Sequence, residues 1–131
     1  MNKAKLFIIP FIGLFLCSCE NYSSHYKALM MVSTQHKDHG SIRFMEFEGQ
    51  YVFNFKKTSA GEGAIYYSAS LETGSVDVTY VALGTESLLF TIKSGQTFNT
   101  YGGYVEKGQK VKVIVRSNAK AINGDFNFRI E

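Results

Sequence analysis

Hydrophobic and polar residues alternate along most of the chain beyond its N-terminal region, and this alternation predicts half-buried β-strands. Residues 75–82 are the clearest example, because Val76 and Val78 alternate there with Asp77 and Thr79. Strand-length runs of this kind, rich in β-branched and aromatic residues, cover residues 28–34, 41–48, 50–56, 63–71, 75–82, 87–93, 96–105, 109–116 and 125–130. We therefore expect a strand in each of these runs.

Turn-forming residues separate the expected strands, as in Glu72-Thr73-Gly74 and Asn123-Gly124. No useful helical periodicity interrupts them, and residues 58–62 are more typical of a loop than of a helical turn. Many short, evenly spaced strands with one polar face predict antiparallel sheets. We expect an all-β fold, an antiparallel two-sheet β-sandwich of jelly-roll type, with a small closed β-barrel as the alternative. Residues 104–113 and 124–128 resemble the last strands of many extracellular β-sandwich modules.

The N-terminal region has a different pattern, a short basic head followed by an apolar run. Lys3 and Lys5 precede residues 6–16, which are apolar apart from Pro10 and Gly13. A membrane-spanning helix needs about 20 apolar residues, so this run is too short to span a bilayer. A charged head and an apolar run of this length match a secretory signal peptide, which we expect to be helical.

The apolar run ends in Leu16-Cys17-Ser18-Cys19, which resembles the lipobox of bacterial lipoproteins. The resemblance implies that Cys19 receives a diacylglycerol group and becomes the first residue of a tethered mature chain. Lipidation at Cys17 is disfavoured because the bulky Leu16 would then precede the modified residue. The alternatives are an ordinary signal peptide cut near Ser18 and an uncleaved N-terminal anchor. The resemblance also implies a bacterial envelope location, on the outer leaflet of the plasma membrane or on the outer membrane.

The chain thus divides into a signal peptide (1–18), a polar tether (19–27) and a single β-sandwich domain (28–131). The mature chain of about 113 residues is long enough for one domain. Both cysteines lie before this domain, so we expect it to contain no disulfide. Without Lys3 and Lys5 there remain 12 basic and 11 acidic residues, a balance that argues against nucleic-acid binding.

Catalytic patterns are missing from the sequence, and we expect a non-enzymatic protein that needs no cofactor. There is no Gly-x-Ser-x-Gly motif, and all three histidines precede residue 40. Two carboxylate pairs, Glu46 with Glu48 and Glu72 with Asp77, have a spacing that glycoside hydrolysis could use. Their positions at a strand end and beside a hairpin are more typical of solvated charges.

His36 and His39, with Asp38 between them, form a cluster of metal-ligating residue types. They could contribute ligands to Zn²⁺ or Cu²⁺, although a complete site needs a third or fourth ligand in fixed geometry. The simpler interpretation is a polar loop between two strands.

Aromatic residues point to a binding surface, because the chain has 8 Tyr, 11 Phe and no Trp. Phenylalanine is expected in the core, whereas a tyrosine hydroxyl needs water or a polar partner. We expect Tyr66, Tyr101 and Tyr104 to bind a glycan or a protein, as exposed tyrosines often do at interfaces. The alternative is that these rings only cover sheet edges and the bases of loops.

Lys110, Lys112 and Arg116 form a basic stripe along one strand face, which is typical of a solvated surface or of a protected sheet edge. Contact with anionic lipid headgroups or wall polymers is the alternative.

Together these patterns predict a membrane-tethered, non-catalytic module that binds protein or glycan. Two other hypotheses remain open: a structural or inhibitory protein acting through the loop 57–63, and metal capture through His36 and His39.

Overall fold

The computed structural model describes residues 22–58, 60–61 and 63–131, and the regular structure in these ranges is entirely β-strand. The strands are β1 (His25–Leu29), β2 (Val32–Gln35), β3 (His39–Lys56), β4 (Ile65–Thr73), β5 (Ser75–Ala82), β6 (Thr85–Lys93), β7 (Thr97–Gly102) and β8 (Lys110–Ile130). No helix in the described ranges is long and apolar enough to cross a membrane. The expected signal helix and the lipobox with Cys19 lie outside the described residues.

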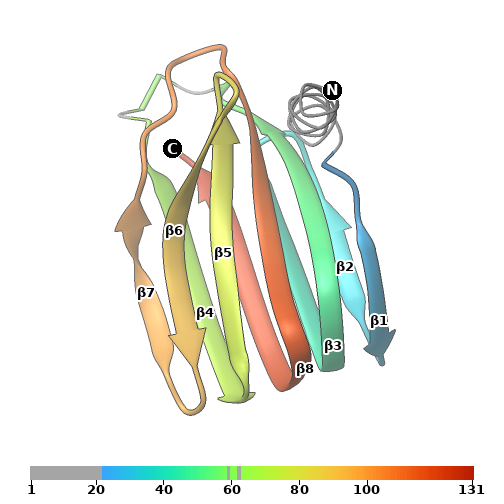
Figure 1. The fold of residues 1–131 in the computed structure, drawn as a ribbon. Helices are drawn as coiled ribbons and strands as arrows, with labels where there is room; N and C mark the ends of the chain where they lie inside the picture. The colour runs from blue at the N-terminus through green and yellow to red at the C-terminus, as the bar shows by residue number, and fades with distance from the viewer. Residues whose placement is uncertain (1–21, 59, 62) are drawn as a thin grey trace, which may run out of the picture.

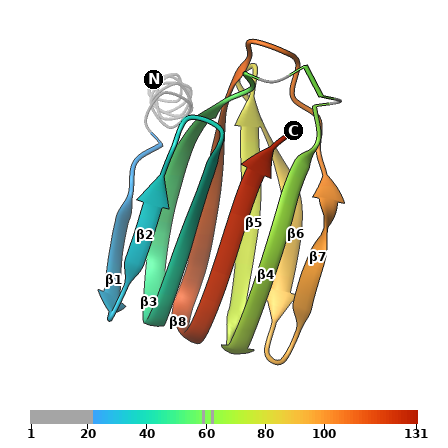
Figure 2. The same ribbon diagram turned by 180° about the vertical axis from the view of Figure 1, so that it is seen from behind.

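The strands form two packed layers (Figures 1 and 2). One layer contains β6, β5, the first half of β8, the second half of β3, and β1. The other contains β2, the first half of β3, the second half of β8, β4 and β7. The antiparallel pairs are nested, β3 with β8, β4 with β7 and β5 with β6, which is the jelly-roll arrangement. The expected β-sandwich is confirmed, and the path β1-β3-β8-β4-β7 is open and so excludes the alternative of a closed barrel.

β3 and β8 each run through both layers, where the sequence had predicted two separate strands in each case. Their ladder shifts register between Phe47 and Gly49, and Gly49 has a φ of 121°. A bulge of this kind bends a strand without ending its pairing. On β8 the same corner includes Ser117, whose hydroxyl donates a hydrogen bond to the carbonyl of Ala119 at 2.5 Å. The two strands can therefore fold over together and join the layers.

The N-terminal strands also differ from the expectation. β1 begins at His25, within the segment for which we expected a tether, and pairs with residues 46–50 of β3. Met30, at a φ of 52°, follows β1, and β2 then pairs with the other half of β3 in the second layer. The single apolar run predicted over residues 28–34 is therefore divided between two strands at a sharp turn.

Phenylalanine dominates the space between the layers, as the composition predicted. Phe47, Phe53 and Phe126 are fully buried, and Phe90 stacks on Tyr67 with ring centroids 4.2 Å apart. The inward residues of β3, β4 and β8 alternate with exposed or half-buried ones. This alternation leaves the outer surface of each layer free to carry polar side chains.

Candidate functional site

Four side chains form a row across the outer surface of the β2-β3-β8-β4-β7 layer. In the ladders, His39 pairs with Arg129, Arg129 with Tyr66, and Tyr66 with Tyr101. The strand neighbours of His39, Arg129 and Tyr66 are buried, so these three side chains point outward, and Tyr101 shares their face as the cross-strand partner of Tyr66. We call this set, His39, Arg129, Tyr66 and Tyr101, the tyrosine row.

Tyr66 is held in place from three sides. Its ring lies 5.3 Å from the ring of Tyr101 at an interplanar angle of 64°, and the guanidinium carbon of Arg129 lies 4.8 Å from its centroid. Its hydroxyl donates a hydrogen bond to the Oδ1 of Asn99 at 2.5 Å. The cation already covers one ring face, so Tyr66 positions its neighbours and has little ring surface left for a ligand.

Arg129 is itself fixed by Glu131. Its Nε donates to the Oε2 of Glu131 at 2.6 Å, and its Nη2 lies 2.6 Å from the same oxygen. This hydrogen bond and the charge of Glu131 raise the pKa of Arg129 above its usual range, and the two tyrosines add to the effect. The ion pair with Glu131 therefore holds the guanidinium in its place over Tyr66.

Tyr101 is the tyrosine in the row that a ligand can reach. It lies near the end of the edge strand β7 and is 54% exposed, whereas Tyr66 is half-buried. Tyr101 therefore presents apolar ring surface at the end of a polar face, a position suited to stacking.

A second row runs beside the tyrosine row and consists of small hydroxyl and amide side chains. Ser41 pairs with Asn127, Asn127 with Ser68, and Ser68 with Asn99. We call this set, Ser41, Asn127, Ser68 and Asn99, the amide row. A shallow hollow of about 360 Å³ lies over part of both rows, bordered also by Thr34. Donors and acceptors thus repeat at the spacing of neighbouring strands, about 4.8 Å.

Tyr104, the third predicted binding tyrosine, lies apart from the tyrosine row. It follows Gly103 after the end of β7 and lies beside Gly63, near the end of the sandwich. The ring is 59% exposed. The structure thus brings together two of the three tyrosines, and it adds Arg129 and His39 through the register of β8.

His36 and His39 stack with ring centroids 4.4 Å apart and planes 16° from parallel. The Nδ1 of His39 shares a hydrogen bond of 2.9 Å with Asp38, and this bond lowers the pKa of the Asp38 carboxyl. Nitrogen lone pairs lie in the ring planes, so two parallel imidazoles do not converge on one ion. Among the described residues, no group of three or more His, Cys, Asp or Glu side chains could hold a metal ion.

The carboxylates considered for hydrolysis have separate surface partners. Glu46 pairs with Lys120 at 3.4 Å, Glu72 accepts a hydrogen bond from Asn123, and Asp77 accepts one from Thr91 at 2.7 Å.

The loop 57–63, considered as an inhibitory loop, is held at both ends by backbone hydrogen bonds. At one end Gly108 donates to Lys57, and at the other Val105 donates to Gly63.

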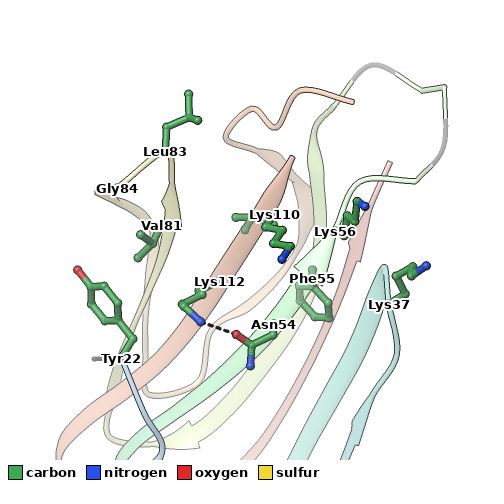
Figure 3. Close-up of a pocket in the computed structure, with 11 residues that line it drawn as sticks. Tyr22, Lys37, Asn54, Phe55, Lys56, Val81, Leu83, Gly84, Lys110 and Lys112 are labelled. Atoms are coloured by element: carbon green, nitrogen blue, oxygen red, sulfur yellow. Dashed lines mark hydrogen bonds between the residues drawn. The ribbon is translucent and has the colours of Figure 1, made fainter. Parts of the chain in front are cut away.

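Two residues of the predicted basic stripe belong to a larger group of lysines on the layer opposite the tyrosine row (Figure 3). Lys110 and Lys112 on β8 border a hollow of about 560 Å³ together with Lys56 on β3 and Lys37 in the β2–β3 turn. Arg116 lies elsewhere, donating to Gln50 and Glu86. The sequence analysis missed Lys37 and Lys56 because only the β3–β8 register brings them beside β8.

No family model and no curated protein matches this chain. Among solved structures it is similar to the EutQ protein of Clostridium difficile, with 12% identity, a TM-score of 0.36, and coverage of 85% of this chain and 66% of that one. It is also similar to the Drosophila melanogaster CENP-C cupin domain (10% identity, TM-score 0.35, coverage 82% and 70%). A third structure, described as "CBM4 structure and function", gives 9% identity, a TM-score of 0.38, and coverage of 82% and 78%. These similarities transfer no function.

Proposed function

We propose that this protein is a lipid-anchored, non-catalytic module of the bacterial cell envelope that binds a glycan. The tyrosine row and the amide row are the proposed binding face, and the lipid on Cys19 is the proposed anchor. Tyr101 supplies a ring for stacking, and the neighbouring amides and hydroxyls supply hydrogen bonds.

One observation supports a binding face more than any other, the exposed ring of Tyr101 at the end of two polar rows. A sugar presents apolar C–H groups on one side and hydroxyl groups around its edge. The ring suits the first, while Asn127, Ser68 and Ser41 offer both donors and acceptors to the second. A shallow open surface also suits a chain of sugars that extends past it.

A glycan fits this face better than a protein does. Protein interfaces usually centre on a buried cluster of large apolar or aromatic residues, with polar groups at the rim. Here the centre of the face is polar and the two tyrosines lie toward one edge. This order is the reverse of a typical protein interface.

The anchor and the absence of catalysis rest on separate arguments. The anchor is supported by the lipobox-like Leu16-Cys17-Ser18-Cys19 after a basic head and an apolar run. A non-catalytic role is supported by the carboxylates, since Glu46, Glu72 and Asp77 each have their own partner. Carboxylates used for glycoside hydrolysis would instead face each other across a cleft.

An array of bacterial envelope polysaccharides, probed with the purified protein, tests the proposal. Tyr101→Ala should weaken binding to the best polysaccharide about tenfold, because it removes the stacking ring. Tyr104→Ala is the matched control, since Tyr104 is equally exposed but lies outside both rows. Equal losses in the two variants, or no saturable binding to any polysaccharide, would contradict a glycan site at the tyrosine row.

A further inference from the structure

Four lysines gather around one hollow on the outer surface of the β6-β5-β8-β3-β1 layer, which is the layer opposite the tyrosine row (Figure 3). Lys56 and Lys110 are direct cross-strand partners, and Lys112 is the next outward residue along β8. Lys37 reaches the same hollow from the turn before β3. We call this set, Lys37, Lys56, Lys110 and Lys112, the lysine hollow.

The charge of the lysine hollow is not balanced by the surrounding protein. Within residues 22–58, 60–61 and 63–131, no carboxylate lies within ion-pairing distance of any of the four ammonium groups. The Nζ of Lys112 donates to the Oδ1 of Asn54 at 2.6 Å, which is a neutral acceptor. Like charges directly opposite each other on paired strands destabilise a sheet, so Lys56 and Lys110 oppose folding unless an anion lies between them. The arrangement therefore favours a negatively charged ligand.

Tyr22 fixes where the N-terminal end of the described chain lies. It packs against a small apolar cluster of Val52, Val81 and Ile114 on the same outer surface, and it borders the lysine hollow. Its hydroxyl also hydrogen-bonds to the carboxylate of Glu86. The chain therefore enters the domain along this layer, beside the lysines.

Cys19 precedes Tyr22 by only three residues. Three fully extended residues span at most about 11 Å. A lipid on Cys19 must therefore enter the bilayer within a short distance of the lysine hollow. The expected tether of residues 19–27 would have held the domain farther away, but its last residues belong to β1.

We infer that the lysine hollow rests on the phosphate headgroups of the membrane that holds Cys19. This inference depends on the lipid anchor of the proposed function. Charge complementarity supports it, because compact ammonium groups suit phosphate oxygens. Leu83, 82% exposed in the turn between β5 and β6, borders the same hollow and can enter the headgroup region.

This docking also orients the binding face. The lysine hollow and the tyrosine row lie on the outer surfaces of opposite layers. When the first layer rests on the membrane, the second points away from it. The glycan-binding face is then presented to the outside.

Lysine acetylation, read by mass spectrometry, tests this orientation on the acylated full chain. The protein is placed in detergent, in phosphatidylcholine vesicles, and in phosphatidylcholine vesicles containing phosphatidylglycerol. We expect Lys56, Lys110 and Lys112 to react about fivefold more slowly on the anionic vesicles than in detergent, given the usual strength of lysine attraction to anionic lipid. Lys27 and Lys93 lie on the same layer but at its other end, where they pair with Glu48 and Ser75, so they should be slowed much less than the lysines of the hollow.

Matched double variants separate a local site from overall charge. Lys56→Gln with Lys110→Gln should remove most of the protection of Lys112. Lys27→Gln with Lys93→Gln removes the same net charge and should leave that protection intact. Equal effects of the two double variants would overturn the inference, because net charge would then explain the binding.

The mass of the N-terminal peptide in the same samples reports whether Cys19 carries lipid. Lipid on Cys19 with unprotected lysines overturns the inference and leaves the proposed anchor standing. A peptide without lipid overturns the anchor, and the docking inference with it. Protection by inorganic phosphate in detergent would assign the hollow to a soluble phosphate ligand and would also overturn docking on headgroups.

Discussion

Tyr66 and Tyr101 lie directly opposite each other on β4 and β7, edge to face, although a hairpin pair of other strands separates them in the sequence. Arg129 covers the free face of Tyr66 and leaves Tyr101 open. Tyr66 therefore supports the surface from below, and Tyr101 supplies the ring that a ligand can contact. Several predictions about this face and its surroundings can be tested by single substitutions.

Tyr66→Phe should lower stability and leave glycan binding nearly unchanged. The substitution removes the hydrogen bond to Asn99 but keeps the ring between Arg129 and Tyr101. We expect the free energy of unfolding in urea to fall by about 1 kcal/mol. Tyr66→Ala removes the ring as well and should weaken both stability and glycan affinity. A large loss of affinity in Tyr66→Phe would show that the hydroxyl contacts the ligand directly.

Gly49→Ala should destabilise the corner at which β3 changes layers. Gly49 has a φ of 121°, and a Cβ there would lie 2.5 Å from the carbonyl oxygen of His25 and 2.7 Å from the Cα of Tyr26. Strain and overpacking together should cost about 2–4 kcal/mol.

Gly84→Ala is the matched control for that substitution. Gly84 also has a positive φ, 77°, but a Cβ there would meet nothing within 4 Å. Only the left-handed backbone is then penalised, at about 1–2 kcal/mol. Urea denaturation of both variants measures the difference, and equal losses would mean that the close approach of β1 to Gly49 does not matter.

Glu86 should make the stability of the domain depend on pH in the acid range. Partial burial raises its pKa, but hydrogen bonds from Thr79, Arg116 and Tyr22 outweigh this, so the pKa lies below its usual value. A carboxyl with a lowered folded-state pKa stabilises the fold above its unfolded-state pKa, and that contribution is lost as the pH falls through the folded-state pKa.

Glu86→Gln should therefore lower the free energy of unfolding by about 1–2 kcal/mol at neutral pH. It should also flatten the decline of stability toward acid, as measured by urea denaturation at a series of pH values. An unchanged acid decline in this variant would assign the pH dependence to other carboxyl groups.

Zn²⁺ should not bind tightly to His36 and His39. The two rings stack nearly parallel, and the described residues supply no third ligand beside them. Calorimetric titration should show only weak binding that is the same in His39→Ala. Saturable tight binding that His39→Ala abolishes would support the metal-capture hypothesis instead.

Cys19→Ala should abolish acylation, whereas Cys17→Ala should preserve it. Only Cys19 occupies the acceptor position of the lipobox-like motif, and an alanine at position 17 makes that motif more typical. Membrane fractionation with mass measurement of the N-terminal peptide distinguishes the two variants. Acylation that survives Cys19→Ala and fails in Cys17→Ala would move the anchor to the other cysteine.

Alternation along the chain predicted the all-β class, β5 from Ser75 to Ala82, and the burial of most phenylalanines. These features are local, because the two-residue period of a strand decides which side chains face the core. Gly49 was harder to interpret, since a glycine can either end a strand or bend it through a bulge. Pairing with β1 and β8 decides that β3 continues through this position.

The sequence by itself determined that Tyr66, Lys56 and Lys110 point outward from their strands. Only the tertiary structure decided which of them meet, because cross-strand neighbours depend on register between segments far apart in the chain. Register aligned Arg129 with Tyr66, placed Lys56 opposite Lys110, and left Tyr104 apart from the other tyrosines. Side-chain direction is set locally by the pleat, whereas a shared surface is set by long-range backbone pairing.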